Sequence, residues 1–76
     1  MNRARRELLR SARTALTEAE NCVSRALDEE QDSLCNMPEN LESSERYEKM
    51  QNAVEQMEEA LDHINSAMDN IESASD

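Results

Sequence analysis

The chain has 76 residues and a formal net charge of −10 at pH 7, with no Gly, Trp or Phe and only one Pro and one Tyr. The lack of Gly excludes the glycine-rich phosphate-binding turns of dinucleotide-binding and P-loop proteins. The scarcity of aromatic and β-branched residues argues against strands. A chain of this length forms one domain at most and has little apolar surface to bury.

The first predicted element is a helix over residues 3–34. Apolar residues recur in it at alternating intervals of three and four, which is the spacing of one helical face. This face drifts sideways along the helix, as expected for 3.6 residues per turn. Cys22 falls on the face and is expected to pack as a small core residue. The expected core or interface residues of this helix are Leu9, Ala12, Leu16, Ala19, Val23 and Ala26.

Residues 35–43 interrupt the helical pattern and are predicted to form a hinge. Pro38 cannot continue a helix and disfavours helical geometry at the residue before it. Asn36 is suited to cap a short turn that begins at Pro38, and Ser43 or Ser44 is suited to cap the next helix. A connection of about eight residues predicts that the two helices pack as antiparallel neighbours.

A second helix is predicted over residues 44–74. Three columns of apolar residues repeat in it every seven positions without a polar member. Two such columns form the contact line of a two-helix coiled coil, whereas three form the wider face of a bundle helix. The expected core or interface residues of this helix are Tyr47, Met50, Val54, Met57, Ala60, Leu61, Ile64, Ala67, Met68 and Ile71.

Together these elements predict an all-α fold, an antiparallel two-helix hairpin of the Ala-rich coiled-coil type, as a single domain over residues 1–76. Alanine columns on both helices allow the helix axes to approach closely. Because the apolar faces are wider than two helices can cover, we expect two chains to form a homodimer with a four-helix bundle.

Charge is divided unevenly along the chain. Residues 1–13 hold five Arg and one Glu, whereas residues 14–76 hold three basic and seventeen acidic residues. A hairpin places the basic start beside Asp69, Glu72 and Asp76, although exposed ion pairs contribute only ~0–1 kcal/mol each. The strongly acidic balance argues against direct binding of nucleic acid. The second helix carries a candidate face for a basic partner, formed by Glu55, Glu58, Glu59 and Asp62.

No catalytic, metal-binding or cofactor-binding residues are predicted. His63 is the only histidine, and its place on the second helix predicts that it faces water. Glu59 precedes it by four positions, whereas di-metal helical bundles use Glu and His three positions apart. No carboxylate is expected in the apolar surroundings that tune a catalytic acid. We therefore expect a protein that is not an enzyme.

The sequence also bears on location. No run of apolar residues approaches the ~18 that a membrane-spanning helix needs. Cys22 and Cys35 are thirteen positions apart, about 20 Å along one helix, which is too far for a disulfide. Free thiols are typical of the reducing cytosol. We therefore expect a cytoplasmic protein with no membrane association, in which Cys35 is exposed at the hinge.

Three segments around the hinge carry a resemblance. They read D-E-E-Q at 28–31, N-M-P-E-N-L at 36–41 and S-E-R-Y-E-K-M at 44–50. This pattern resembles small acidic helical-hairpin proteins of gut bacteria and their mobile elements, in which Leu is more usual at the position of Met37. The resemblance implies a hairpin and implies no chemistry.

Two functions fit these features. The first is a small non-enzymatic interaction or adaptor protein that self-associates through its apolar faces. The second is an inhibitor encoded by a mobile element, whose acidic rod mimics nucleic acid and blocks a host defence or regulatory protein. Carboxylates along the second helix present negative charge at a spacing broadly comparable to a phosphate backbone. The partner in the second case is a basic, nucleic-acid-binding protein.

Overall fold

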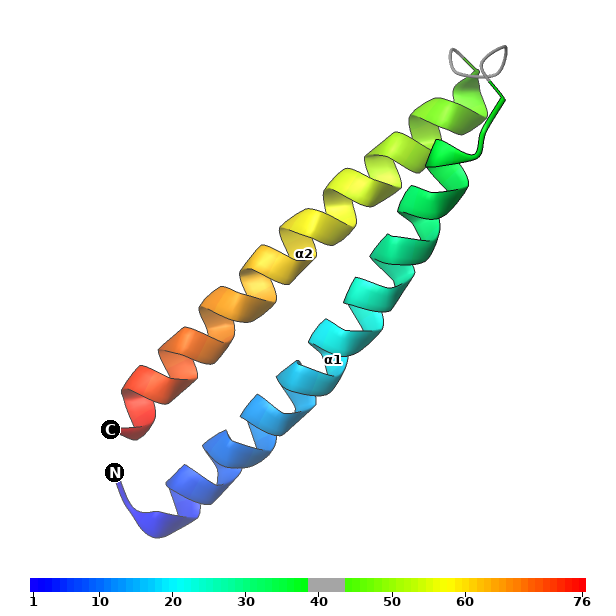
Figure 1. Ribbon diagram of the computed structural model, residues 1–76. Coiled ribbons are helices and arrows are strands. Elements are labelled where there is room, and N and C mark those ends of the chain that lie inside the picture. Colours follow the sequence, from blue (N-terminus) through cyan, green and yellow to red (C-terminus); the bar gives the residue numbers. More distant parts are fainter. Residues whose placement is uncertain (39–43) are drawn as a thin grey trace.

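The computed structural model describes residues 1–38 and 44–76 as two long helices. Helix α1 spans Arg3–Cys35 and helix α2 spans Glu45–Ser75, and no strand occurs in the described residues. The helices run antiparallel and side by side (Figure 1). The predicted all-α, two-helix hairpin is thus confirmed.

The rod formed by the two helices has two distinct ends. Both chain termini lie together at one end, the open end, and Cys35 and Glu45 lie at the other, the connection end (Figure 1). The predicted helix ranges 3–34 and 44–74 differ from the observed bounds by one residue at three of the four helix ends. Residues 39–43 of the predicted hinge, with the candidate cap Ser43, lie outside the described residues.

Polar side chains and backbone groups define the two ends of α1. The Oδ1 atom of Asn2 accepts a hydrogen bond from the backbone N–H of Arg5 at 2.9 Å, so Asn2 is the N-cap. Asn36 is the C-cap, and its backbone N–H donates to the carbonyl of Asp32 at 3.1 Å. These bonds satisfy groups that helix ends leave without intrahelical partners. The prediction that Asn36 caps a short turn beginning at Pro38 involves residues 39–43, which lie outside the described part of the chain.

Helix α2 begins at Ser44. The Oγ atom of Ser44 accepts a hydrogen bond from the backbone N–H of Tyr47 at 3.2 Å, which confirms Ser44 as a cap. Glu45 and Glu48 follow in the first turn, where the helix dipole favours negative charge. The start of α2 is therefore stabilised twice, by a cap and by acids.

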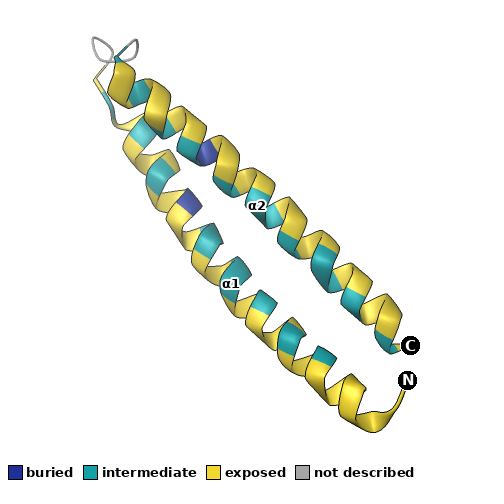
Figure 2. Cartoon of the chain, turned by 180° about the vertical axis from the view of Figure 1, so that it is seen from behind, coloured by how far each residue is buried: buried dark blue, intermediate teal, exposed yellow. Residues whose placement is uncertain are grey.

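The core between the helices is thin. Leu27 and Val54 are the two residues of the described part that are buried, with 9% and 8% of their surface exposed. Half-buried residues line the facing sides of both helices, and none of the described side chains is completely enclosed (Figure 2). The rod measures 59 × 14 × 13 Å between Cα atoms. Two helices alone thus bury one narrow line of side chains.

We expect Ser44→Ala to lower the free energy of unfolding by about 1 kcal/mol, because it removes the side-chain acceptor at the start of α2. Ser44→Asp is the matched control, since Asp keeps an acceptor and adds a charge that the helix dipole favours. Chemical denaturation followed by circular dichroism measures both. Equal losses in the two variants would contradict the capping role.

Candidate interaction surfaces

The hairpin has two long sides, one on each side of the plane that contains both helix axes. One side carries a contact between charged groups of the two helices, with Nη2 of Arg13 3.6 Å from Oε2 of Glu72. One turn further along α1, Oγ1 of Thr17 lies 3.6 Å from Sδ of Met68. We call this the charged side. The two contacts also give the register of the antiparallel helices.

The opposite side is different in composition. A shallow groove on it is lined by Ala26, Glu29, Glu30 and Ser33 of α1 together with Met57 of α2. Successive residues of a helix are rotated by about 100° around its axis. Seen along α1, this rotation places Ala26 on one side of the line of contact with α2 and Arg13 on the other. The same periodicity places two rows from each helix on this side, and their members are uncharged over residues 8–26 of α1 and 53–74 of α2. Beyond this stretch, the α1 rows continue to Arg5 at one end and to Glu29 at the other. These rows, the uncharged side, consist of Leu8, Ala12, Ala15, Ala19, Cys22 and Ala26 of α1 and Ala53, Met57, Ala60, Ile64, Ala67 and Ala74 of α2.

Several residues of the uncharged side are left open to solvent by the hairpin. Leu8 has 70% of its surface exposed, and Ala15, Cys22 and Ala26 are exposed as well. The prediction that Cys22 packs in the core is therefore wrong for the hairpin. Ala26, predicted in a core or interface, also lies outside the hairpin core. Both residues stand to the side of the line along which α1 contacts α2.

The other residues expected in a core or interface lie along the inner faces of the helices. Val54 is buried. Leu27, which belongs to the apolar face predicted for the first helix, is the most buried residue of α1, because this face drifts toward it near the connection end. The half-buried residues of the expected set are Leu9, Ala12, Leu16, Ala19, Val23, Tyr47, Met50, Met57, Ala60, Leu61, Ile64, Ala67, Met68 and Ile71.

The four carboxylates of the candidate acidic face, Glu55, Glu58, Glu59 and Asp62, are all exposed on α2. Oε1 of Glu59 lies 3.7 Å from Nε2 of His63, whose side chain is 76% exposed. Within the described residues, none of the four carboxylates pairs with Lys or Arg. This face therefore presents negative charge that the described part of the chain leaves largely unneutralised.

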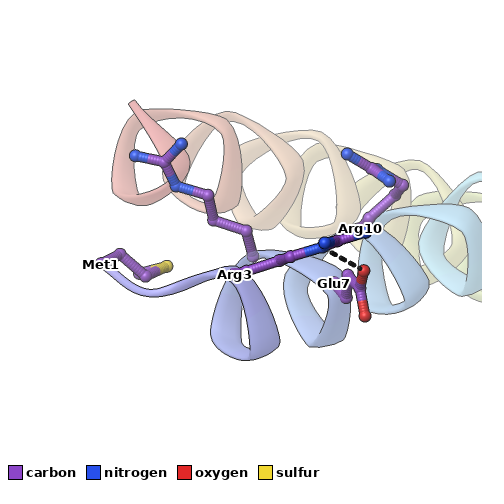
Figure 3. Close-up of a pocket in the computed structure, with 5 residues that line it drawn as sticks. Met1, Arg3, Glu7 and Arg10 are labelled. Carbon is purple, nitrogen blue, oxygen red and sulfur yellow. Dashed lines mark hydrogen bonds and ion pairs between the residues drawn. The ribbon is translucent and has the colours of Figure 1, made fainter.

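Arginines gather at the open end. Nε of Arg3 lies 3.3 Å from Oε1 of Glu7 (Figure 3), and Arg13 pairs with Glu72. Arg6 and Arg10 line two neighbouring surface grooves and have no carboxylate within 4.0 Å in the described part of the chain. One groove also contains the acids Glu72 and Asp76, which were expected near the basic start.

Asp69, also expected there, forms no ion pair within residues 1–38 and 44–76. The grooves are bounded by long exposed side chains, so they form an open, mixed-charge surface.

Neither cysteine of the chain is in a disulfide, and both are exposed, as expected for Cys35. No three His, Cys, Asp or Glu side chains of the described residues are grouped so as to hold a metal ion. Neither helix carries an apolar segment long enough to cross a membrane within its described residues.

Comparisons with protein-family models, with curated proteins and with solved structures gave no match. The resemblance to small acidic hairpin proteins therefore stays a prediction.

We expect Ala60→Leu and Ala67→Leu each to lower stability by about 1–3 kcal/mol or to change how the helices pair, because a larger side chain overpacks a close helix contact. His63→Ala lies on the same helix but faces water, and should change stability by no more than about 0.5 kcal/mol. Thermal melts compare the three variants. Equal melting temperatures would mean that the alanine rows do not lie in a packed contact.

Proposed function

We propose that the chain is a non-enzymatic protein-interaction module that acts as a homodimer, in which two hairpins pack through their uncharged sides into a four-helix bundle. The observation that supports this is the pair of uncharged rows on each helix, whose members the hairpin leaves half-buried or exposed. An extended surface of this kind on a small protein marks an interaction site.

Surface area supports the same proposal. A compact monomer of 8.7 kDa would expose roughly 4,700 Å², by the usual scaling of surface with mass. The hairpin exposes 5855 Å². The excess, about 1,100 Å², is similar to the ~800 Å² that each partner contributes to an interface of standard size. Packing of two hairpins would bring the exposed surface of each chain close to the ordinary value.

The residues of the uncharged side suit a helix–helix contact. Most of them are alanines, and small side chains allow helix axes to come within about 8–10 Å. Leu8, Met57 and Ile64 supply larger apolar groups among them. Burial of apolar surface contributes about 25 cal/mol per Å² before the costs of association are subtracted. In this dimer the charged side and the acidic face remain in water.

Light scattering coupled to size exclusion should give a mass of about 17 kDa at micromolar concentration, twice that of one chain. Ala15→Glu should abolish the dimer, because a charge without a partner would be buried in the contact. The variant chain should run as a helical monomer or lose helix content, since two helices alone bury little.

The matched control is Asn21→Glu. It adds the same charge to the same helix, but Asn21 is exposed and lies outside the uncharged rows. This variant should remain a dimer. A folded monomer for the wild type, or equal behaviour of the two variants, would contradict dimerisation through the uncharged side.

We also propose, as a second candidate, that the protein inhibits a basic nucleic-acid-binding protein by presenting its acidic face. The observation that favours it is the exposure of Glu55, Glu58, Glu59 and Asp62 without Lys or Arg partners in the described part of the chain. Face-to-face dimerisation would leave these carboxylates in water. An acidic surface of this kind attracts cationic partners over a range that salt shortens.

An oligo-arginine peptide is a suitable probe, with affinity measured by calorimetry at low salt. Neutralising the face with E55Q, E58Q, E59Q and D62N together should weaken binding about tenfold or more. The control removes four acids from the first helix instead, with E18Q, E20Q, D28N and D32N, so the net charge is the same. Equal losses in both variants would show attraction by overall charge alone and would count against a specific acidic face.

A further inference from the structure

We infer that the two hairpins of the dimer are reversed end for end, so that the open end of one covers the connection end of the other. The inference rests on the proposed homodimer and adds its symmetry and register. Each α1 then faces the partner's α1, and each α2 faces the partner's α2. The two-fold axis crosses α1 between Ala15 and Ala19.

Two symmetric arrangements bring the uncharged sides face to face. If the two-fold axis runs along the rod, both connection ends lie together and α1 covers the partner's α2. If the axis runs across the rod, the hairpins are reversed. Neighbouring helices are antiparallel in both arrangements, so helix packing alone does not choose between them. Both interfaces use the same surface twice, as two-fold symmetry requires, and the choice falls to charge and side-chain size.

Charge along the rod favours the reversed arrangement. At the connection end, the described residues 25–38 and 44–52 hold three basic and six acidic residues, a net charge of −3. The open end, residues 1–13 and 65–76, holds five basic and four acidic residues, a net charge of +1. The other arrangement would place two ends of net charge −3 side by side, within the ~8 Å over which physiological salt leaves charges unscreened.

The residues at the ends of the two α1 rows also favour the reversed arrangement. Arg5 stands at the open end of the row that contains Ala12, Ala19 and Ala26, and it has no carboxylate within 4.0 Å in the described part of the chain. Glu29 ends the other row of the uncharged side and lines the groove beside Met57. One row of α1 therefore ends at a cation at the open end, and the other row ends at an acid toward the connection end.

When the partner hairpin is reversed about the centre of these rows, the α1 rows of one chain are complementary to the same rows of the partner. The larger side chain of Leu8 falls opposite a small one, and the unpaired Arg5 falls opposite an acid. The facing residues are Arg5 with the partner's Glu29, Leu8 with the partner's Ala26, Ala12 with the partner's Cys22, and Ala15 with the partner's Ala19.

The rows of α2 are centred about one helical turn from this point. They run from Ala53 to Ala74, so their middle lies close to Ile64. Thr17, at the middle of the α1 rows, contacts Met68, about one turn from Ile64. One axis across the rod therefore passes within about one helical turn of the centres of the rows on both helices.

A distance between labels tests the orientation. Cys35 is exposed at the connection end and is not a member of the uncharged rows, so a spin label there leaves the contact intact. In a Cys22→Ala chain labelled at Cys35, pulsed dipolar spectroscopy should give a separation of about 50 Å for reversed hairpins, from the rise of 1.5 Å per residue. Hairpins with both connections together should give less than about 30 Å, because neighbouring axes are only about 8–10 Å apart.

The outcomes separate the two proposals. A long distance supports the reversed dimer. A short distance overturns the orientation and leaves the proposed homodimer standing. A chain that is monomeric by light scattering and gives no dipolar signal overturns the homodimer, and the orientation with it.

Cross-linking provides an independent check. In a background with Cys22→Ala and Cys35→Ser, Ala19→Cys alone should form a covalent dimer with a short bis-maleimide, because the two substituted positions lie close to the axis. If both connections lay together, position 19 would instead face the partner's α2. A cross-link that forms only when this chain is mixed with an Ala67→Cys chain would overturn the reversed arrangement. Failure of both reactions in a confirmed dimer would also overturn the proposed axis.

Discussion

The structure depends on one constraint, which is that two helices in contact bury only a single line of side chains. Leu27 and Val54 are the residues of the described part that this contact buries. The remaining apolar residues of both helices are left half-buried or exposed. Because burial of apolar surface is the main favourable term in folding, the stability of so small a hairpin is tied to what covers the rest of its apolar surface.

Charge is distributed so that this surface remains uncharged. Arg13 and Glu72 meet across the helices on the opposite side, and the acidic residues Glu55, Glu58 and Asp62 lie on the outside of α2. The uncharged side is therefore available for packing, while the overall charge of −10 is carried elsewhere on the chain. The proposed self-association and the proposed binding of a basic partner would use different surfaces, so one dimer would accommodate both.

The ends of the helices are held locally. Asn2 and Ser44 each accept a hydrogen bond from a backbone N–H in the first turn of their helix. Such caps are strong sequence signals because they depend on one residue and its near neighbours. They determine where a helix begins, and they carry no information about which of its faces meets another helix.

The amino-acid pattern alone was enough to predict the helices, their bounds to within one residue, the antiparallel hairpin and a cap at Ser43 or Ser44, because spacing, proline and capping act over a few residues. The structure shows that Ser44 is the cap. Which apolar rows the hairpin uses became known only from the packing of the two helices. Cys22, Ala26 and Leu27 all have the spacing of the predicted apolar face, yet Cys22 and Ala26 are exposed and Leu27 is buried. Periodicity places residues on a helix face but does not say how that face is rotated toward its neighbour, since this depends on where the second helix lies and on the drift of the face along the first.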